Sequence, residues 1–178
     1  MTKKPAVFLD RDGVINRAIV RGGRPYAPHR VEDLEVLPGV AEALARLKAE
    51  GFALVVITNQ PDVARGSLTE ETLRAMHQHL ATLLPLDELR VCCHDDSDGC
   101  DCRKPKAGLL TRPPLYDLNR SVVVGDRWRD IEAGHRAGCR AAVLIDYGYD
   151  EQQTTTPDVR VRSLSEAADW ILSTTVKA

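Results

Sequence analysis

Short apolar runs of the length of a β-strand recur along this chain. Most of them are continuous rather than alternating with polar residues, which is typical of strands whose two faces are both buried. The pattern predicts five strands, which we expect at Ala6–Leu9, Phe52–Thr58, Leu89–Cys93, Ser121–Val124 and Ala141–Ile145.

Segments with apolar residues at helical spacing lie between these runs. They predict four helices, from Val40 to Gly51, from a capping box at Ser67–Glu70 to Leu83, at Arg129–Ala137 and at Ser163–Leu172. The alternation of strands and helices predicts an α/β fold, with a three-layer, Rossmann-like parallel sheet that has helices on both faces. The chain has 178 residues, an ordinary length for one domain, so we expect residues 1–178 to form a single domain.

Polar residues follow the ends of four of the predicted strands. In parallel sheets, ligands bind at the carboxyl ends of the strands, so these residues are expected to meet at one edge. They are Asp10-Arg11-Asp12-Gly13, Thr58-Asn59-Gln60, Arg103-Lys104-Pro105 and Gly125-Asp126-Arg127.

The residue types at this edge favour phosphoryl transfer. Residues two apart on an extended segment point the same way, so Asp10 and Asp12 face one small volume. Two close carboxylates repel unless a cation or a shared proton relieves them. Asp126 adds a third oxygen ligand, and such a set suits Mg²⁺. Lys104 adds a fixed positive charge and Thr58-Asn59 adds neutral donors, which completes a phosphoryl-transfer site.

Each of these residues taken alone has a more ordinary interpretation. An isolated Asp-x-Asp-Gly is usually a turn or a weak metal loop, Asp126 could cap a helix, and Lys104 could be a solvated charge. Their joint placement, each directly after a strand, favours the catalytic interpretation.

A cluster of cysteines and one histidine predicts a second metal site. Cys92 with His94, and Cys100 with Cys102, offer three thiolates and an imidazole within residues 92–102. This donor set suits tetrahedral Zn²⁺, and an ion with four protein ligands would be structural. A disulfide pair and unbound thiols are the alternatives. A nucleic-acid-binding zinc module is disfavoured, because residues 94–101 contain four acidic residues and no Lys or Arg.

The strand-end motifs together resemble those of a known family. Taken in order, they resemble the four motifs of the haloacid dehalogenase superfamily of phosphatases, over about residues 6–146: Asp10-x-Asp12-Gly13-Val14, Thr58-Asn59, Lys104-Pro105 and Gly125-Asp126-x-x-x-Asp130. The resemblance implies a HAD-like fold and a Mg²⁺-dependent phosphatase.

The resemblance also implies a role for each residue. Asp10 would be the nucleophile that forms an aspartyl-phosphate. Asp12 would act as general acid and then general base, and would bind Mg²⁺ through its backbone carbonyl beside Asp10 and Asp126. Asp130 would be a neighbour of the metal or an alternative ligand. Phosphoryl oxygens would be held by two catalytic residues, Thr58 and Lys104.

The stretch Cys100–Pro105, which joins the cysteine cluster to Lys104, is similar to one subgroup of that superfamily. Its members are heptose bisphosphate phosphatases and histidinol-phosphate phosphatases. The resemblance favours the 7-phosphate of a heptose 1,7-bisphosphate as substrate, with histidinol phosphate or another small phosphate ester as the alternative. The residues expected to bind the substrate are Asn16, Arg17, Asn59, Gln60, Arg103 and Arg127.

Composition limits the partners and the compartment. The net charge of −2 gives no reason to expect nucleic acid or an anionic membrane as a partner, and no apolar stretch is long enough to span a bilayer. We therefore expect a cytoplasmic monomer that acts on a small phosphorylated sugar. The segment Val14–Leu37 is expected to be only a loop, so a large cap domain over the site is not expected.

Overall fold

The computed structural model describes residues 2–175. Its main sheet has six strands in the order β5-β4-β1-β6-β7-β8, and all neighbouring strands are parallel. The strands are β1 (Ala6–Leu9), β4 (Ala53–Asn59), β5 (Glu88–Cys92), β6 (Val122–Gly125), β7 (Ala141–Ile145) and β8 (Val159–Val161). The predicted parallel α/β sheet is confirmed, and each of the five expected strands lies within one residue of its expected bounds. The sequence pattern missed β8, because a strand of three residues leaves too short an apolar run.

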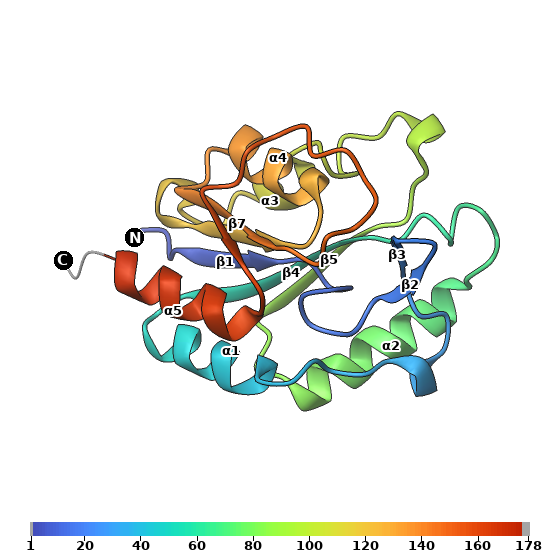
Figure 1. The fold of residues 1–178 in the computed structure, drawn as a ribbon, viewed down its shortest axis with the longest axis horizontal. Coiled ribbons are helices and arrows are strands. Elements are labelled where there is room, and N and C mark those ends of the chain that lie inside the picture. The colour runs from blue at the N-terminus through green and yellow to red at the C-terminus, as the bar shows by residue number, and fades with distance from the viewer. Residues whose placement is uncertain (1, 176–178) are drawn as a thin grey trace.

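Helices cover both faces of this sheet (Figure 1). One layer contains α1 (Val40–Ala49), α2 (Glu70–Leu83) and α5 (Leu164–Thr174), and the other contains α3 (Gly108–Thr111) and α4 (Trp128–Ala137). The expected three-layer arrangement is therefore confirmed. Among residues 2–175, no helix has both the length and the apolar character that crossing a bilayer requires.

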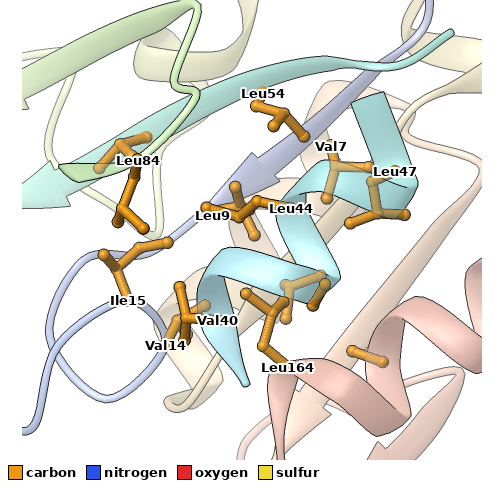
Figure 2. Packing of buried hydrophobic residues seen from close by; sticks show 14 of the residues in the cluster. Val7, Leu9, Val14, Ile15, Val40, Leu44, Leu47, Leu54, Leu84 and Leu164 are labelled. Carbon is orange, nitrogen blue, oxygen red and sulfur yellow. The ribbon is translucent and has the colours of Figure 1, made fainter. Parts of the chain in front are cut away.

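The alternating directions of the β1 side chains divide the core into two clusters. Val7 and Leu9 pack on the side of α1 and α5, whereas Phe8 packs on the side of α3 and α4. Figure 2 shows Val7 and Leu9 beside Leu44 and Leu47 of α1. All four residues of β1 are completely buried, so the core holds this strand in place. The position of the strand in turn fixes the position of the next residue, Asp10.

The start of α2 differs from the expected one. Thr69 is the N-cap, and its side-chain oxygen accepts a hydrogen bond of 3.1 Å from the backbone N–H of Thr72. Ser67 instead donates from its hydroxyl to the carbonyl of Asp62. The capping box expected at Ser67–Glu70 is therefore wrong, because Thr69 rather than Ser67 caps the helix.

The segment between β1 and α1 is more than a loop. It contains an antiparallel hairpin of β2 (Ile19–Arg21) and β3 (Arg24–Tyr26), followed by a short 3₁₀ turn at Val31–Asp33. Gly22 and Gly23 join the two strands with φ angles of 55° and 74°, as a two-residue hairpin turn requires. The expectation of a plain loop is wrong, and Figure 1 shows the hairpin beside the carboxyl ends of the main strands.

Candidate active site

The first strand delivers Asp10 directly to a buried lysine. Lys104 is only 2% exposed, and its Nζ lies 2.9 Å from Oδ1 of Asp10 and 2.6 Å from Oδ1 of Asp130. The same ammonium donates to the carbonyl of Ile57 at 2.8 Å. The ammonium therefore contacts two carboxylates and one backbone carbonyl. Asp10 Oδ1 also accepts the backbone N–H of Arg11, which leaves Oδ2 without a hydrogen bond to the described residues.

Asp126 at the end of β6 completes a cluster of three buried carboxylates. Asp10, Asp126 and Asp130 each offer an oxygen within 4.8 Å of the others. Both side-chain oxygens of Asp126 are buried and lack a hydrogen-bond partner among residues 2–175. Gly13, with a φ angle of 86°, packs so closely that a Cβ there would collide with the Asp126 carboxylate. The cluster has oxygen ligands of the kind that a hard divalent cation prefers.

The raised pKa values of Asp10 and Asp126 indicate that this site has too little positive charge. Burial raises the pKa of Asp10 to about 6, the charge of Asp130 adds to the rise, and Lys104 partly offsets it. Burial, with the charges of Asp10 and Asp130, also raises the pKa of Asp126 well above its usual value. The phenol of Tyr149 partly offsets this rise but does not reach hydrogen-bond geometry with Asp126. A bound divalent cation would supply the missing charge.

Lys104 itself stays protonated in this environment. Burial alone would lower the pKa of its ammonium, but the charges of Asp10 and Asp130 and the hydrogen bonds to them outweigh it, and the pKa rises. Lys104 is therefore a fixed cation beside Asp10.

Asp12 is held by three neighbouring side chains. Its carboxylate accepts from Nη2 of Arg11 at 3.0 Å, from Nδ2 of Asn16 at 2.9 Å and from Nε2 of Gln60 at 2.8 Å. Arg11 is completely buried and also contacts Nε2 of His77 at 3.1 Å. Burial, with the charge of Arg11, lowers the pKa of His77 to about 4.

The sequence did not predict the contacts of Arg11 with Asp12 and His77. The available signal was a charged residue between two strand-end aspartates. It could not show that α2 would place a histidine there.

Asn59, the last residue of β4, and the next residue, Gln60, both form hydrogen bonds to the catalytic candidates. Asn59 accepts the backbone N–H of Lys104 at 3.1 Å and donates to the carbonyl of Lys104 at 3.0 Å. Gln60 donates to the hydroxyl of Thr58 at 2.9 Å as well as to Asp12, and it is completely buried. Asn59 thus fixes the backbone that carries the buried lysine, and Gln60 connects Thr58 to Asp12.

A cavity of about 440 Å³ opens in front of Asp10, Asp12 and Lys104. Five arginines are among the residues that line it: Arg24, Arg65, Arg103, Arg127 and Arg129. The structure thus places the predicted residues Arg103 and Arg127 at the cavity. Arg17 is not among the lining residues, and its guanidinium pairs with Glu35 at 2.8 Å.

The predicted cysteine cluster is brought together. The ligand atoms of Cys92, His94, Cys100 and Cys102 lie within 4.8 Å of one another, with neighbouring pairs 3.0 to 3.7 Å apart. Four ligands around tetrahedral Zn²⁺ have sulfur–sulfur separations of about 3.8 Å, calculated from a bond length of about 2.3 Å. The described cysteines are all free thiols, so the alternative of a disulfide is not seen. The arrangement fits a four-coordinate N/S metal site.

The site combines a buried aspartate–lysine pair, two further aspartates and a cavity at the carboxyl edge of a parallel sheet. These features define a hydrolase that acts on phosphate esters. The sequence profile of the haloacid dehalogenase-like hydrolases matches residues 9–138. The chain belongs to that family.

Three relatives of this chain match nearly its whole length, and all of them are named for the same enzymatic activity. D-glycero-beta-D-manno-heptose-1,7-bisphosphate 7-phosphatase of Escherichia coli (strain K12) is 36% identical, over 95% of this chain and 88% of the relative. D-glycero-D-manno-heptose-1,7-bisphosphate 7-phosphatase of Thermosynechococcus vestitus is 34% identical, over 94% of this chain and 95% of its own. The crystal structure of D,D-heptose 1,7-bisphosphate phosphatase from B. bronchiseptica, complexed with magnesium and phosphate, superimposes with a TM-score of 0.77 at 30% identity. It covers 96% of this chain and 99% of that one.

Proposed function

We propose that this chain is a Mg²⁺-dependent phosphatase that hydrolyses a sugar phosphate monoester through an aspartyl-phosphate on Asp10. The preferred substrate is the 7-phosphate of D-glycero-D-manno-heptose 1,7-bisphosphate. The observation that carries the proposal is the buried Asp10–Lys104 pair beside Asp126 and Asp130, in a chain whose relatives have this activity in their names.

Magnesium is proposed to bind the side chains of Asp10 and Asp126 and the backbone carbonyl of Asp12, with Asp130 as a close neighbour. The unpartnered oxygens of Asp126 and the excess of buried negative charge support this assignment. The relative from B. bronchiseptica contains magnesium together with phosphate. When bound, the ion supplies positive charge that stabilises the phosphoryl oxygens during transfer.

The side chains of this chain divide the reaction into two steps. Asp10 attacks the phosphorus through Oδ2, the oxygen that its hydrogen bonds leave free, and the bond to the sugar oxygen breaks. Asp12 gives its proton to that leaving oxygen. In the second step Asp12 takes a proton from water, which attacks the phosphorus and releases phosphate from Asp10. Lys104 and Thr58 are proposed to hold the phosphoryl oxygens throughout.

The cysteine cluster is proposed to bind one structural Zn²⁺ through Cys92, His94, Cys100 and Cys102. The donor set and the short separations of the four ligand atoms support this proposal. The zinc loop, residues 92–102, also contains Asp96, which accepts from Nε of Arg103 at 2.8 Å. An ion that orders this loop would therefore fix Arg103 at the cavity.

The part of the substrate that is not cleaved is proposed to contact Arg103 and Arg127, both of which line the cavity. Roles for Asn16, Arg17, Asn59 and Gln60 in direct contact with substrate stay predictions. A single-domain chain, a cytoplasmic location and a monomeric state also stay predictions.

Phosphate release from purified protein tests this proposal. The substrates are α- and β-anomers of the heptose bisphosphate, histidinol phosphate and simple sugar monophosphates. We expect the highest kcat/KM for a heptose bisphosphate, loss of activity in EDTA and its recovery on addition of Mg²⁺. A higher kcat/KM for histidinol phosphate would contradict the substrate assignment while leaving the phosphatase assignment intact.

A further inference from the structure

The β2–β3 hairpin forms one wall of the catalytic cavity. Arg24, Pro25 and Tyr26 of β3 line the same cavity as Asp10 and Lys104. Figure 1 shows the hairpin at the edge of the main sheet where β1 and β4 end. A substrate whose phosphate reaches Asp10 must therefore extend past this hairpin or away from it.

The hairpin is attached firmly enough to position a side chain. The carbonyl of Gly23 in its turn accepts the backbone N–H of Asp150 at 2.8 Å. Gly23 has a φ angle of 74°, and a Cβ at this position would lie 2.9 Å from Cβ of Asp150, so only glycine allows the two backbones to approach this closely. The turn is thus fixed to the segment after β7, which also provides Glu151 next to Arg127. A hairpin of two three-residue strands is marginal alone, so this contact holds the wall in place.

Arg24 differs from the other arginines of the cavity in having no acidic partner. Each of the other four lies within 3.3 Å of a carboxylate oxygen: Arg65 of Asp95, Arg103 and Arg129 of Asp96, and Arg127 of Glu151. Within residues 2–175, no hydrogen bond or ion pair engages the side chain of Arg24. Among the five cavity arginines, Arg24 is therefore the one whose charge is not already neutralised by direct contact with a protein carboxylate.

The position of Arg24 is also unfavourable for the hairpin itself. Arg24 is the cross-strand partner of Arg21, and two like charges directly opposite each other destabilise an antiparallel pair. Arg21 is placed near the ring of Tyr26, whereas Arg24 is placed at the cavity. Hairpin stability therefore gives no reason for an arginine at position 24, and an anionic ligand in the cavity gives one.

We propose that Arg24 is a specificity-determining residue that binds the phosphate group of the substrate that is not hydrolysed. This inference rests on the proposed function, because it requires a substrate with a second anionic group. A guanidinium offers paired N–H donors that match two phosphate oxygens, so it favours a bisphosphate over a monophosphate of the same sugar. The hairpin thereby selects the substrate at the end of the cavity away from Asp10.

The test compares two substrates and matched variants. The substrates are heptose 1,7-bisphosphate and heptose 7-phosphate, which has the same reacting group but lacks the second phosphate. Arg24→Gln should lower kcat/KM for the bisphosphate about tenfold to hundredfold, mainly through KM, because a charge-assisted contact is lost. Its kcat/KM for the 7-phosphate should stay within about twofold of the original protein.

Two further variants make the result specific to Arg24. Arg21→Gln removes the same charge from the facing strand and should leave both substrates within about twofold, because its side chain is not part of the cavity lining. Arg24→Lys keeps the charge without the paired donors and should lose less on the bisphosphate than Arg24→Gln. Melting temperatures identify a variant whose hairpin no longer folds.

Three outcomes would contradict the role of Arg24, and a fourth would contradict the proposed function. Equal losses on both substrates, no loss on either, or an equal loss in Arg21→Gln would overturn the role of Arg24. If the wild-type protein cleaves neither compound, the proposed function is wrong, and this inference is wrong with it.

Discussion

The buried ammonium of Lys104 allows the strongest prediction about stability. Lys104→Met keeps a chain of similar length but removes the cation that contacts Asp10 and Asp130. Breaking a buried ion pair by removing one partner costs about 3–5 kcal/mol, because the remaining charges stay buried without compensation. In a domain of this size, each kcal/mol lowers the melting temperature by about 2–4 °C. The expected loss in the presence of EDTA is therefore about 6–20 °C.

Lys48→Met is the matched control on the surface. Lys48 pairs with Asp87 at 2.9 Å, the same separation as Lys104 to Asp10, but its side chain is 38% exposed. A solvent-exposed pair contributes about 0–1 kcal/mol, so this variant should lose no more than about 4 °C. The comparison separates the effect of burial from that of the distance between the charges.

Calorimetry and urea unfolding in EDTA measure both losses, and a second series contains Mg²⁺. Added Mg²⁺ should recover part of the loss in Lys104→Met, because the ion can balance the charges of Asp10, Asp126 and Asp130. Equal losses in the two lysine variants, or a Lys104→Met protein as stable as the original in EDTA, would refute this account of the site.

Three further predictions concern the nucleophile, the cysteine cluster and the buried histidine. Asp10→Asn should lower kcat by at least about three orders of magnitude while the protein stays folded, and near-normal phosphate release would contradict this. Elemental analysis should find about one zinc per chain, and Cys102→Ser should lose it and melt at a lower temperature; an active, zinc-free protein would exclude the site. The folded-state pKa of His77 is lowered from 6.5 to about 4, so its protonation favours the unfolded state. Unfolding free energy should fall as pH drops from about 6.5 to about 4, with a contribution of at most about 1.4 kcal/mol per pH unit that His77→Gln removes, and identical pH profiles would contradict it.

Continuous apolar strands made much of the candidate site predictable from the sequence. Buried strands that alternate with helices must be parallel, so the residues after them meet at one edge. That rule places Asp10, Lys104 and Asp126 in one site before any contact is known. The spacing of Cys92, His94, Cys100 and Cys102 similarly predicted a cluster that the structure brings together.

The remaining features depend on tertiary contacts that no local pattern encodes. The β2–β3 hairpin has strands of only three residues, and its arginines, glycines and proline resemble a loop. Arg11 meets His77 across 66 positions of sequence, through the packing of α2 on the sheet. Asn59 and Gln60 were expected to bind substrate, and their hydrogen bonds to Lys104, Thr58 and Asp12 are further contacts that the sequence did not predict.

The central claim is that phosphate is transferred to Asp10 before water takes it. The most direct test uses Asp12→Asn and p-nitrophenyl phosphate, whose leaving group departs without protonation. This variant should complete the first step but stall in the second, because no carboxylate at position 12 activates water. Rapid acid quenching should then show a burst of nitrophenol equal to the enzyme concentration, and mass spectrometry should find one phosphoryl group on the peptide that contains Asp10. No burst, or a phosphoryl group on a different residue, would contradict the account.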